Sequence, residues 1–337
     1  MTGRVVGTSM VKSPPPGDAV GLPTTPPSSA SQSDEASHAE TPKRLRTRTR
    51  YNRGEVLTAA LCLAPALVVI GLFVVYPLIS TGLLSLTDWD GLTPDKPFVG
   101  LDNYIKLAGD ASFRNSMLVT VLYGLGVCAL SVLTGIGGAT LLNGAFRGRA
   151  VYRTAFFLPV VTSSIAAAAV WRYLFDVSGP VNAGLSALGL GSPSWLGDPH
   201  LALVSLTLLT VWKQLGLNTV LYLTALQTIP AQVYEAASLD GASAWQRMRH
   251  ITVPLLAPMT FFVVVQALVT TFQSFDLVYQ LTAGGPLGGT EVVGFLVYRT
   301  AFVTGQFGYG ATIAYAGFAL VFALTWIQWR LGGRGES

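Results

Sequence analysis

The sequence predicts an all-α, polytopic membrane protein with six transmembrane helices, and three observations point to this fold class. The 337 residues are 51% hydrophobic and only 11% charged, a balance too apolar for a soluble domain of this size. Several apolar runs exceed the roughly 20 residues that a helix needs to cross a bilayer. Basic residues gather at the edges of these runs, so the net charge of +4 does not indicate nucleic acid as a partner.

Residues 1–54 are expected to form a disordered cytoplasmic tail that ends in a basic cluster. The part up to residue 42 is rich in Pro, Ser, Thr and Ala, and such a segment buries too little apolar surface to offset the entropy that ordering would cost. A regulatory role, a merely solvated tail and a start codon assigned too far upstream all remain open for it. The cluster that follows is expected to stay inside the cell and to contact anionic membrane lipid. It comprises Lys43, Arg44, Arg46, Arg48, Arg50 and Arg53.

Six apolar spans account for most of the remaining chain. The first transmembrane helix is expected within 55–90, followed by an external loop over 91–114. Five further helices are expected to form a core over 115–332, with spans at 117–142, 151–175, 201–228, 255–281 and 307–329. The segments that this order places inside the cell carry thirteen basic residues and the external segments carry four, so the positive-inside rule puts both termini in the cytoplasm. Small residues in the second span would let a neighbouring helix approach closely, namely Gly124, Gly135, Gly137 and Gly138.

The stretch 230–258, between the fourth and fifth spans, predicts two short helices joined at a glycine. Pro230 suits the first turn of a helix, and Gly241 can end that helix in a left-handed conformation. Ser243 and Gln246 have the spacing of a capping box, which would begin the second helix. Read on its own, the stretch is an amphipathic connector at the membrane surface.

This stretch also resembles the EAA loop of the inner-membrane permease subunits of binding-protein-dependent ABC importers. The family pattern is EAA, two residues, DGA, then a bulky residue, Ile and Pro at fixed spacing. The matching positions are Glu235, Ala236, Ala237, Asp240, Gly241, Ala242, Ile251 and Pro254. Met248 stands where these permeases usually carry Phe, and its adaptable side chain can fill the same pocket. The resemblance implies that the loop is a coupling helix that docks onto a cytoplasmic ATPase.

Two further regions are similar to the sugar-permease branch of this family, specifically to its maltose-type first permease subunit. One is the helix end YP…TDW (76–89) with the segment GLDNY (100–104). The other is GGP (284–286), followed by Thr290, Tyr298-Arg299 and FGYGA (307–311). Without the resemblance, these regions are an aromatic exit belt, an interfacial stretch and a turn between spans.

The resemblance covers residues 55–330 and implies the type I ABC-importer permease fold. It also implies four partners: a second homologous permease subunit, a cytoplasmic ABC ATPase dimer, an extracytoplasmic solute-binding (lipo)protein and a sugar substrate. In such a transporter, Glu235 would hold the first coupling helix against the ATPase or a neighbouring backbone. Asp240 and Gly241 would set the corner between the two helices.

The sequence carries no motif for chemistry of its own. It lacks the G-x-x-x-x-G-K-[ST] phosphate loop, the G-x-S-x-G elbow and the H-E-x-x-H zinc motif. Cys62 and Cys128 fall inside apolar spans and the three histidines are scattered, so neither a disulfide nor a metal site is expected. We therefore expect no catalytic residue and no cofactor, and the energy for transport must come from a partner.

Polar residues within the spans are candidates for a solute path, because such side chains are costly in lipid. The fourth span contributes Lys213 and Asn218, with Trp212 beside them as a ring that can stack on a sugar. The fifth contributes Gln266, Gln273, Ser274 and Asp276, with Tyr279 as a second such ring. Two other interpretations remain open: a structural ion pair between Lys213 and Asp276, or contacts of these residues with the partner permease.

We interpret the chain as the permease subunit of a carbohydrate ABC importer in the inner (plasma) membrane of a prokaryote. An ABC permease for glycerol phosphate or a polyol is an alternative, since a binding protein sets much of the specificity. An ion-coupled secondary transporter would need an inverted repeat and paired acids for a coupling ion, and neither is evident. A membrane scaffold would use the EAA helices only for docking.

Overall fold

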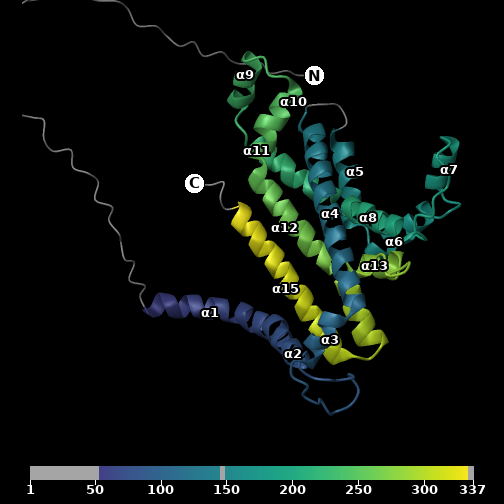
Figure 1. The fold of residues 1–337 in the computed structure, drawn as a ribbon. Helices are drawn as coiled ribbons and strands as arrows, with labels where there is room; N and C mark the ends of the chain where they lie inside the picture. The colour runs from purple at the N-terminus through teal and green to yellow at the C-terminus, as the bar shows by residue number, and fades with distance from the viewer. Residues whose placement is uncertain (1–52, 145–148, 333–337) are drawn as a thin grey trace, which may run out of the picture. The chain divides into compact units, whose positions relative to one another are not determined.

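The computed structural model describes residues 53–144 and 149–332, and the regular elements among them are helices (Figure 1). Residues 1–52 of the predicted tail lie outside the described residues, and residues 53 and 54 are helical. The chain divides into two compact units, Met1–Leu61 and Cys62–Ser337. The first unit is described only from residue 53, where α1 (Arg53–Ile70) begins, and the contacts reported below lie within the second unit.

Four helices of the described chain are long and apolar enough to cross a membrane. The first spans Ala60–Leu84 and joins α1, the π-helical segment η1 (Gly71–Val75) and α2 (Tyr76–Leu84). The other three are α4 (Ala111–Asn143), α8 (Pro199–Gln227) and α15 (Phe307–Gly332). They correspond to the predicted first, second, fourth and sixth spans.

The predicted third span is not one continuous helix. In its place, α5 (Arg149–Val161) and α6 (Ser164–Leu174) meet at an angle of 109°. Pro159 removes a backbone donor from the last turns of α5, and Ser163 is extended, with a ψ of 139°. The six predicted spans are obtained when each bent helix pair counts as one span.

The predicted fifth span is also interrupted. Its main helix, α12 (Ala257–Gln273), meets the helix before it at 67° and ends at Ser274, which separates it from α13 (Phe275–Leu281). Arg172 of α6 donates hydrogen bonds to the carbonyl oxygens of Gln280 and Leu281 at the end of α13. The two interrupted spans are thus joined, because the guanidinium satisfies carbonyl groups that a helix end leaves free.

The packed centre of the second unit is formed by α4 and α8, which lie against each other. Gly135 and Gly138 face α8, and a Cβ at Gly135 would lie only 2.7 Å from the Tyr222 ring. Gly124 faces α12 instead, and a Cβ at Gly137 would meet nothing within 4 Å. Two of the four glycines, Gly135 and Gly138, therefore allow the predicted close approach of a neighbouring helix, which is α8.

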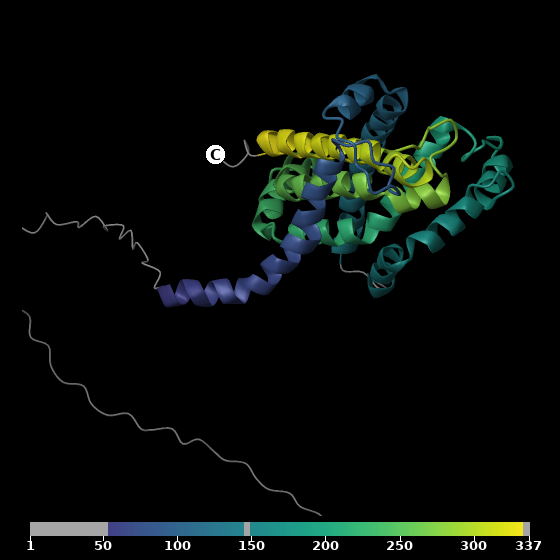
Figure 2. The ribbon, with the colours of Figure 1, turned by 90° about the horizontal axis from the view of Figure 1, so that it is seen from below.

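On another side of the core, α15 lies along α12, as both ribbon views show (Figures 1 and 2). The side-chain amide of Gln328 donates a hydrogen bond of 3.1 Å to the carbonyl oxygen of Phe261, which joins the two helices. Cys62 is exposed and Cys128 is buried, and the two do not form a disulfide.

Short elements close the end of the unit that lies away from the 230–258 loop (Figure 1). They are α3 (Asp102–Gly109), α14 (Val293–Tyr298) and the π-helical segment η3 (Arg299–Val303). Asn103 of α3 donates to the carbonyl oxygens of Ser85 and Thr87, at 3.1 and 2.9 Å, which ties α3 to the end of the first span. A further short helix, α7 (Pro180–Ala187), lies in the connection between α6 and α8.

Candidate coupling loop and solute path

The 230–258 stretch forms two short helices around a glycine corner. The first helix is α9 (Ala231–Leu239), which begins one residue after Pro230. Gly241 has a φ of +76°, in the left-handed region that glycine favours. The amide of Ala242 donates to the carbonyl oxygen of Ala237 at 2.9 Å across the corner. The predicted glycine stop is confirmed.

The second helix begins at the predicted capping box. The amide of Gln246 donates to the Ser243 hydroxyl oxygen at 3.3 Å, and the amide of Ser243 donates to the Gln246 side-chain oxygen at 2.7 Å. This start leads into α10 (Ala244–Arg247), the π-helical segment η2 (Met248–Thr252) and α11 (Val253–Leu255), which contains Pro254 in its first turn. The loop therefore has one defined backbone path into α12.

Side chains fasten the two helices to each other. The hydroxyl groups of Tyr234 and Thr252 lie 3.0 Å apart, and Arg247 donates to the Ser238 hydroxyl oxygen. Met248 is half-buried and lines a cavity of about 370 Å³ with Tyr234 and Thr252. Because these contacts link α9 to η2, the loop can move as one body.

Two large apolar side chains of the loop are exposed. Leu239 is 89% exposed and Trp245 is 71% exposed. Glu235 and Ala236 are exposed as well, and Glu235 makes no hydrogen bond to a neighbouring backbone among the described residues. Both roles expected for Glu235, contact with the ATPase and contact with a neighbouring backbone, stay predictions. Neither Leu239 nor Trp245 belongs to the EAA pattern, so both were missed, although they are large apolar residues in predicted surface helices.

The candidate path residues of the fourth span differ in their surroundings. Trp212 packs against Trp171, with ring centroids 5.8 Å apart. Lys213 donates a 2.6 Å hydrogen bond to the Ser164 hydroxyl oxygen, and no ion pair with Asp276 forms among the described residues. The interpretation of Lys213 and Asp276 as a structural ion pair is therefore wrong.

Two buried amides on α8 have no hydrogen-bond partner. Asn218 is 1% exposed and Gln214, one turn earlier, is 8% exposed. Neither the oxygen nor the nitrogen of either side-chain amide makes a hydrogen bond within the described structure. Leaving such groups unpaired costs free energy, so the two amides mark this face of α8 as a functional candidate. Gln214 was missed, although its spacing of four residues from Asn218 places both on one helix face.

The candidates of the fifth span differ in their exposure. Gln266 is half-buried on α12, Gln273 is exposed, and Ser274 is buried at the break, where its hydroxyl donates to the carbonyl oxygen of Thr270 at 2.6 Å. Asp276 is exposed on α13. Tyr279 lines a separate cavity at the far end of the unit from the coupling loop.

The fold and this site define a class of protein: a helical membrane protein with a well-ordered two-helix loop between two of its spans and no phosphate-binding motif of its own. The chain belongs to the family of binding-protein-dependent transport system inner membrane components, whose model matches residues 131–333. It is therefore a multi-pass, non-catalytic inner-membrane component of a binding-protein-dependent ABC transporter. The family recognised from the EAA loop is confirmed.

Two relatives show how far the similarity extends. The trehalose/maltose transport system permease protein MalF of Thermococcus litoralis is 33% identical over 289 residues, which cover 86% of this chain and 97% of the relative. The lactose transport system permease protein LacF of Rhizobium radiobacter is 33% identical over 274 residues, covering 80% and 91%. The fold is also similar to a chain of a bacterial ABC transporter involved in alginate import, with a TM-score of 0.69, 22% identity and coverage of 85% and 98%.

Proposed function

We propose that this chain is the permease subunit of an ATP-driven importer for a sugar or oligosaccharide that an extracytoplasmic binding protein delivers. It would pair with a second homologous permease and with a cytoplasmic ATPase dimer. The observation that carries this proposal is the coupling loop, a rigid two-helix unit with Leu239 and Trp245 exposed. The sugar assignment is supported by relatives whose names describe trehalose/maltose and lactose transport.

The loop is built to transmit force from an ATPase to the spans. Leu239 and Trp245 would enter an apolar groove of the ATPase, and Glu235 and Asp240 would add polar contacts at its edge. The Tyr234–Thr252 and Arg247–Ser238 hydrogen bonds link the two helices, so that they would move together. Because η2 and α11 lead directly into α12, a displacement of the loop would change the tilt of α12 against α4 and α8.

The solute path would run along the faces of α8 and α12. Asn218 and Gln214 offer unpaired amide groups that match sugar hydroxyls. Gln266, Gln273 and Ser274 would add donors and acceptors from α12 and its C-terminal end, and Trp212 and Lys213 would border the path near α6. Membrane lipid would cover the exposed apolar faces of the outer helices.

A deletion strain tests the sugar assignment directly. Uptake of radiolabelled maltose, trehalose and lactose is compared between the wild type, a strain that lacks this chain, and a complemented strain. We expect uptake of at least one of these sugars to be lost on deletion and restored on complementation. If uptake of all three sugars is unchanged and uptake of glycerol phosphate or a polyol is lost, that solute, and not a sugar, is the substrate.

A further inference from the structure

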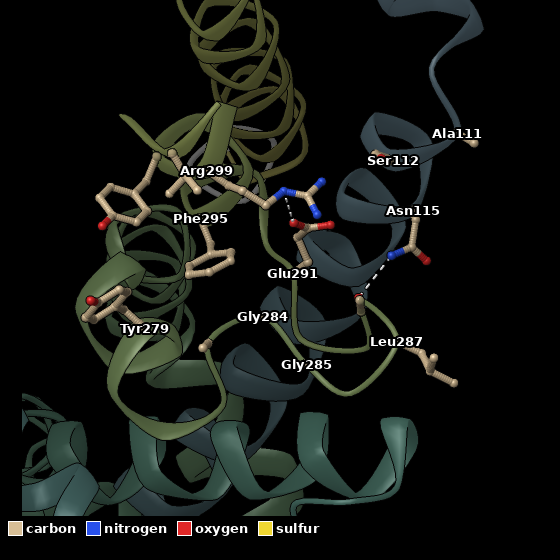
Figure 3. A pocket seen from close by; sticks show the side chains of 14 residues that line it. Ala111, Ser112, Asn115, Tyr279, Gly284, Gly285, Leu287, Glu291, Phe295 and Arg299 are labelled. Carbon is tan, nitrogen blue, oxygen red and sulfur yellow. Dashed lines mark hydrogen bonds and ion pairs between the residues drawn. The ribbon is translucent and has the colours of Figure 1, made fainter. Parts of the chain in front are cut away.

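A cavity of about 740 Å³ lies at the end of the unit that the charge distribution places outside the cell. It is an open hollow bordered by the first turns of α4, the loop over 283–289, Tyr279 of α13, and α14 with η3 (Figure 3). Its volume falls within the roughly 300–1,000 Å³ typical of small-molecule sites, so it has room for a sugar ring. The candidate path on α8 contributes none of its lining.

One wall of this external cavity is aromatic. The ring centroid of Tyr279 lies 6.5 Å from that of Phe295 and 5.6 Å from that of Tyr298. Phe295 is buried, whereas Tyr279 is 44% exposed and keeps free ring surface. The C–H face of a pyranose is apolar and carries partial positive charge, so it is attracted to the negative face of such a ring.

The opposite wall is polar and electrically balanced. Arg299 Nε lies 3.0 Å from Glu291 Oε1, and the terminal guanidinium nitrogens make no hydrogen bond among the described residues. Figure 3 shows these nitrogens directed toward the side of the cavity where Asn115 lies. Asn115 donates to the Gly288 carbonyl oxygen at 3.0 Å, and its amide oxygen accepts no bond from the described chain. Planar donors and acceptors beside a neutralised charge suit the hydroxyls of an uncharged sugar.

The loop between the two walls is held in one conformation. The Thr290 hydroxyl donates to the Gly285 carbonyl oxygen at 2.8 Å and lies 2.6 Å from the Thr282 hydroxyl. Gly284 and Gly288 adopt left-handed conformations, with φ of 80° and 75°. Because the loop is ordered by its own contacts, a ligand would lose little affinity to loop ordering.

We propose that this cavity is an external sugar subsite, in which a neutral pyranoside leaving the binding protein is held before it enters the path between α8 and α12. The inference rests on the proposed import of a sugar. Tyr279 stacks on the sugar ring, and Arg299 and Asn115 hold its hydroxyls. Tyr279 thus acts outside the membrane path with which sequence analysis grouped it.

The test uses the complete transporter in liposomes and the sugar that the wild type imports, at a subsaturating concentration of loaded binding protein. Tyr279→Ala is expected to lower the initial uptake rate about tenfold, and Tyr279→Phe to retain at least about half of it, because the ring remains. Arg299→Lys keeps a charge beside Glu291 but loses the planar donors, so it is expected to lower uptake about fivefold. Phe302→Ala removes a neighbouring exposed ring outside the cavity and is expected to stay within about twofold of the wild type.

Saturation-transfer NMR on the transporter without binding protein gives a second readout that does not depend on uptake. We expect transfer to the C–H protons of the sugar, and its loss in Tyr279→Ala. Wild-type uptake by Tyr279→Ala and Arg299→Lys, or no transfer to the sugar, would overturn the external subsite while leaving sugar import intact. A wild-type transporter that imports no sugar would overturn the proposed function as well.

Discussion

Gly241→Val should uncouple transport without preventing membrane insertion. Gly241 has a φ of +76°, and a side chain in the left-handed region costs about 1–2 kcal/mol, with β-branched residues at the upper end. A Cβ at this position would meet nothing within 4 Å, so no steric clash adds to that cost. A penalty of about 1–2 kcal/mol lowers the population of the native corner roughly 5–30-fold.

Two control variants separate this backbone effect from a general loss of stability. Gly241→Asn is expected to retain most activity, because Asn tolerates the left-handed conformation. Gly137→Val places the same side chain within α4, where a Cβ would also meet nothing within 4 Å and the backbone is helical, so uptake should stay close to normal.

The assay measures uptake and binding-protein-stimulated ATP hydrolysis in liposomes, with the amount of membrane-inserted chain determined by immunoblot. Gly241→Val should reach the membrane at normal levels and lose about 80–97% of both activities, in line with the roughly 5–30-fold penalty. Normal uptake by Gly241→Val would refute the role of the corner. An equal loss in Gly241→Asn would show that the left-handed backbone is not the reason.

Three further predictions concern other parts of the molecule. Trp245→Ser should reduce copurification of the ATPase about tenfold or more with little change in thermal unfolding, because the 71% exposed ring contributes to a partner contact and not to the core. Asn218→Leu removes an unpaired buried amide, so it should leave the thermal unfolding temperature unchanged or raise it, and it should lower sugar uptake. A large loss of stability would contradict this prediction. Burial raises the pKa of Glu291 above 4.5, with Asp110 acting in the same direction and Arg299 against it. Because the folded protein holds this proton more tightly than the unfolded chain, protonated Glu291 stabilises the fold fully below pH 4.5, and this stabilisation is lost as pH rises through the raised pKa. Glu291→Gln should therefore flatten the pH dependence of the thermal unfolding temperature above pH 4.5.

Local signals in the sequence predicted the backbone of the 230–258 loop. The stop at Gly241 follows from backbone sterics, and the capping box from two side chains three residues apart, so neither depends on distant parts of the chain. The four continuous spans were predictable for a similar reason, because a helix must be apolar over about 20 residues to cross a bilayer.

The bends in two spans could not be predicted in the same way. A straight apolar run at 151–175 gives no measure of the 109° angle, and Pro159 indicates only that a break is permitted. The end of α13 is held by Arg172, more than a hundred residues away in the chain, and only the packed structure shows this contact. The exposure of Trp245 and the pairing of Glu291 with Arg299 likewise depend on tertiary arrangement.

The most direct test of the account is to identify what copurifies with the chain. The C-terminus is tagged, the protein is purified in mild detergent, and the associated proteins are identified by mass spectrometry, with a Trp245→Ser variant processed in parallel. We predict recovery of an ATPase with a phosphate-binding loop and of a second six-span permease, and loss of the ATPase in the variant. Recovery of this chain alone, stable and still able to move a solute, would contradict the account and favour a secondary transporter.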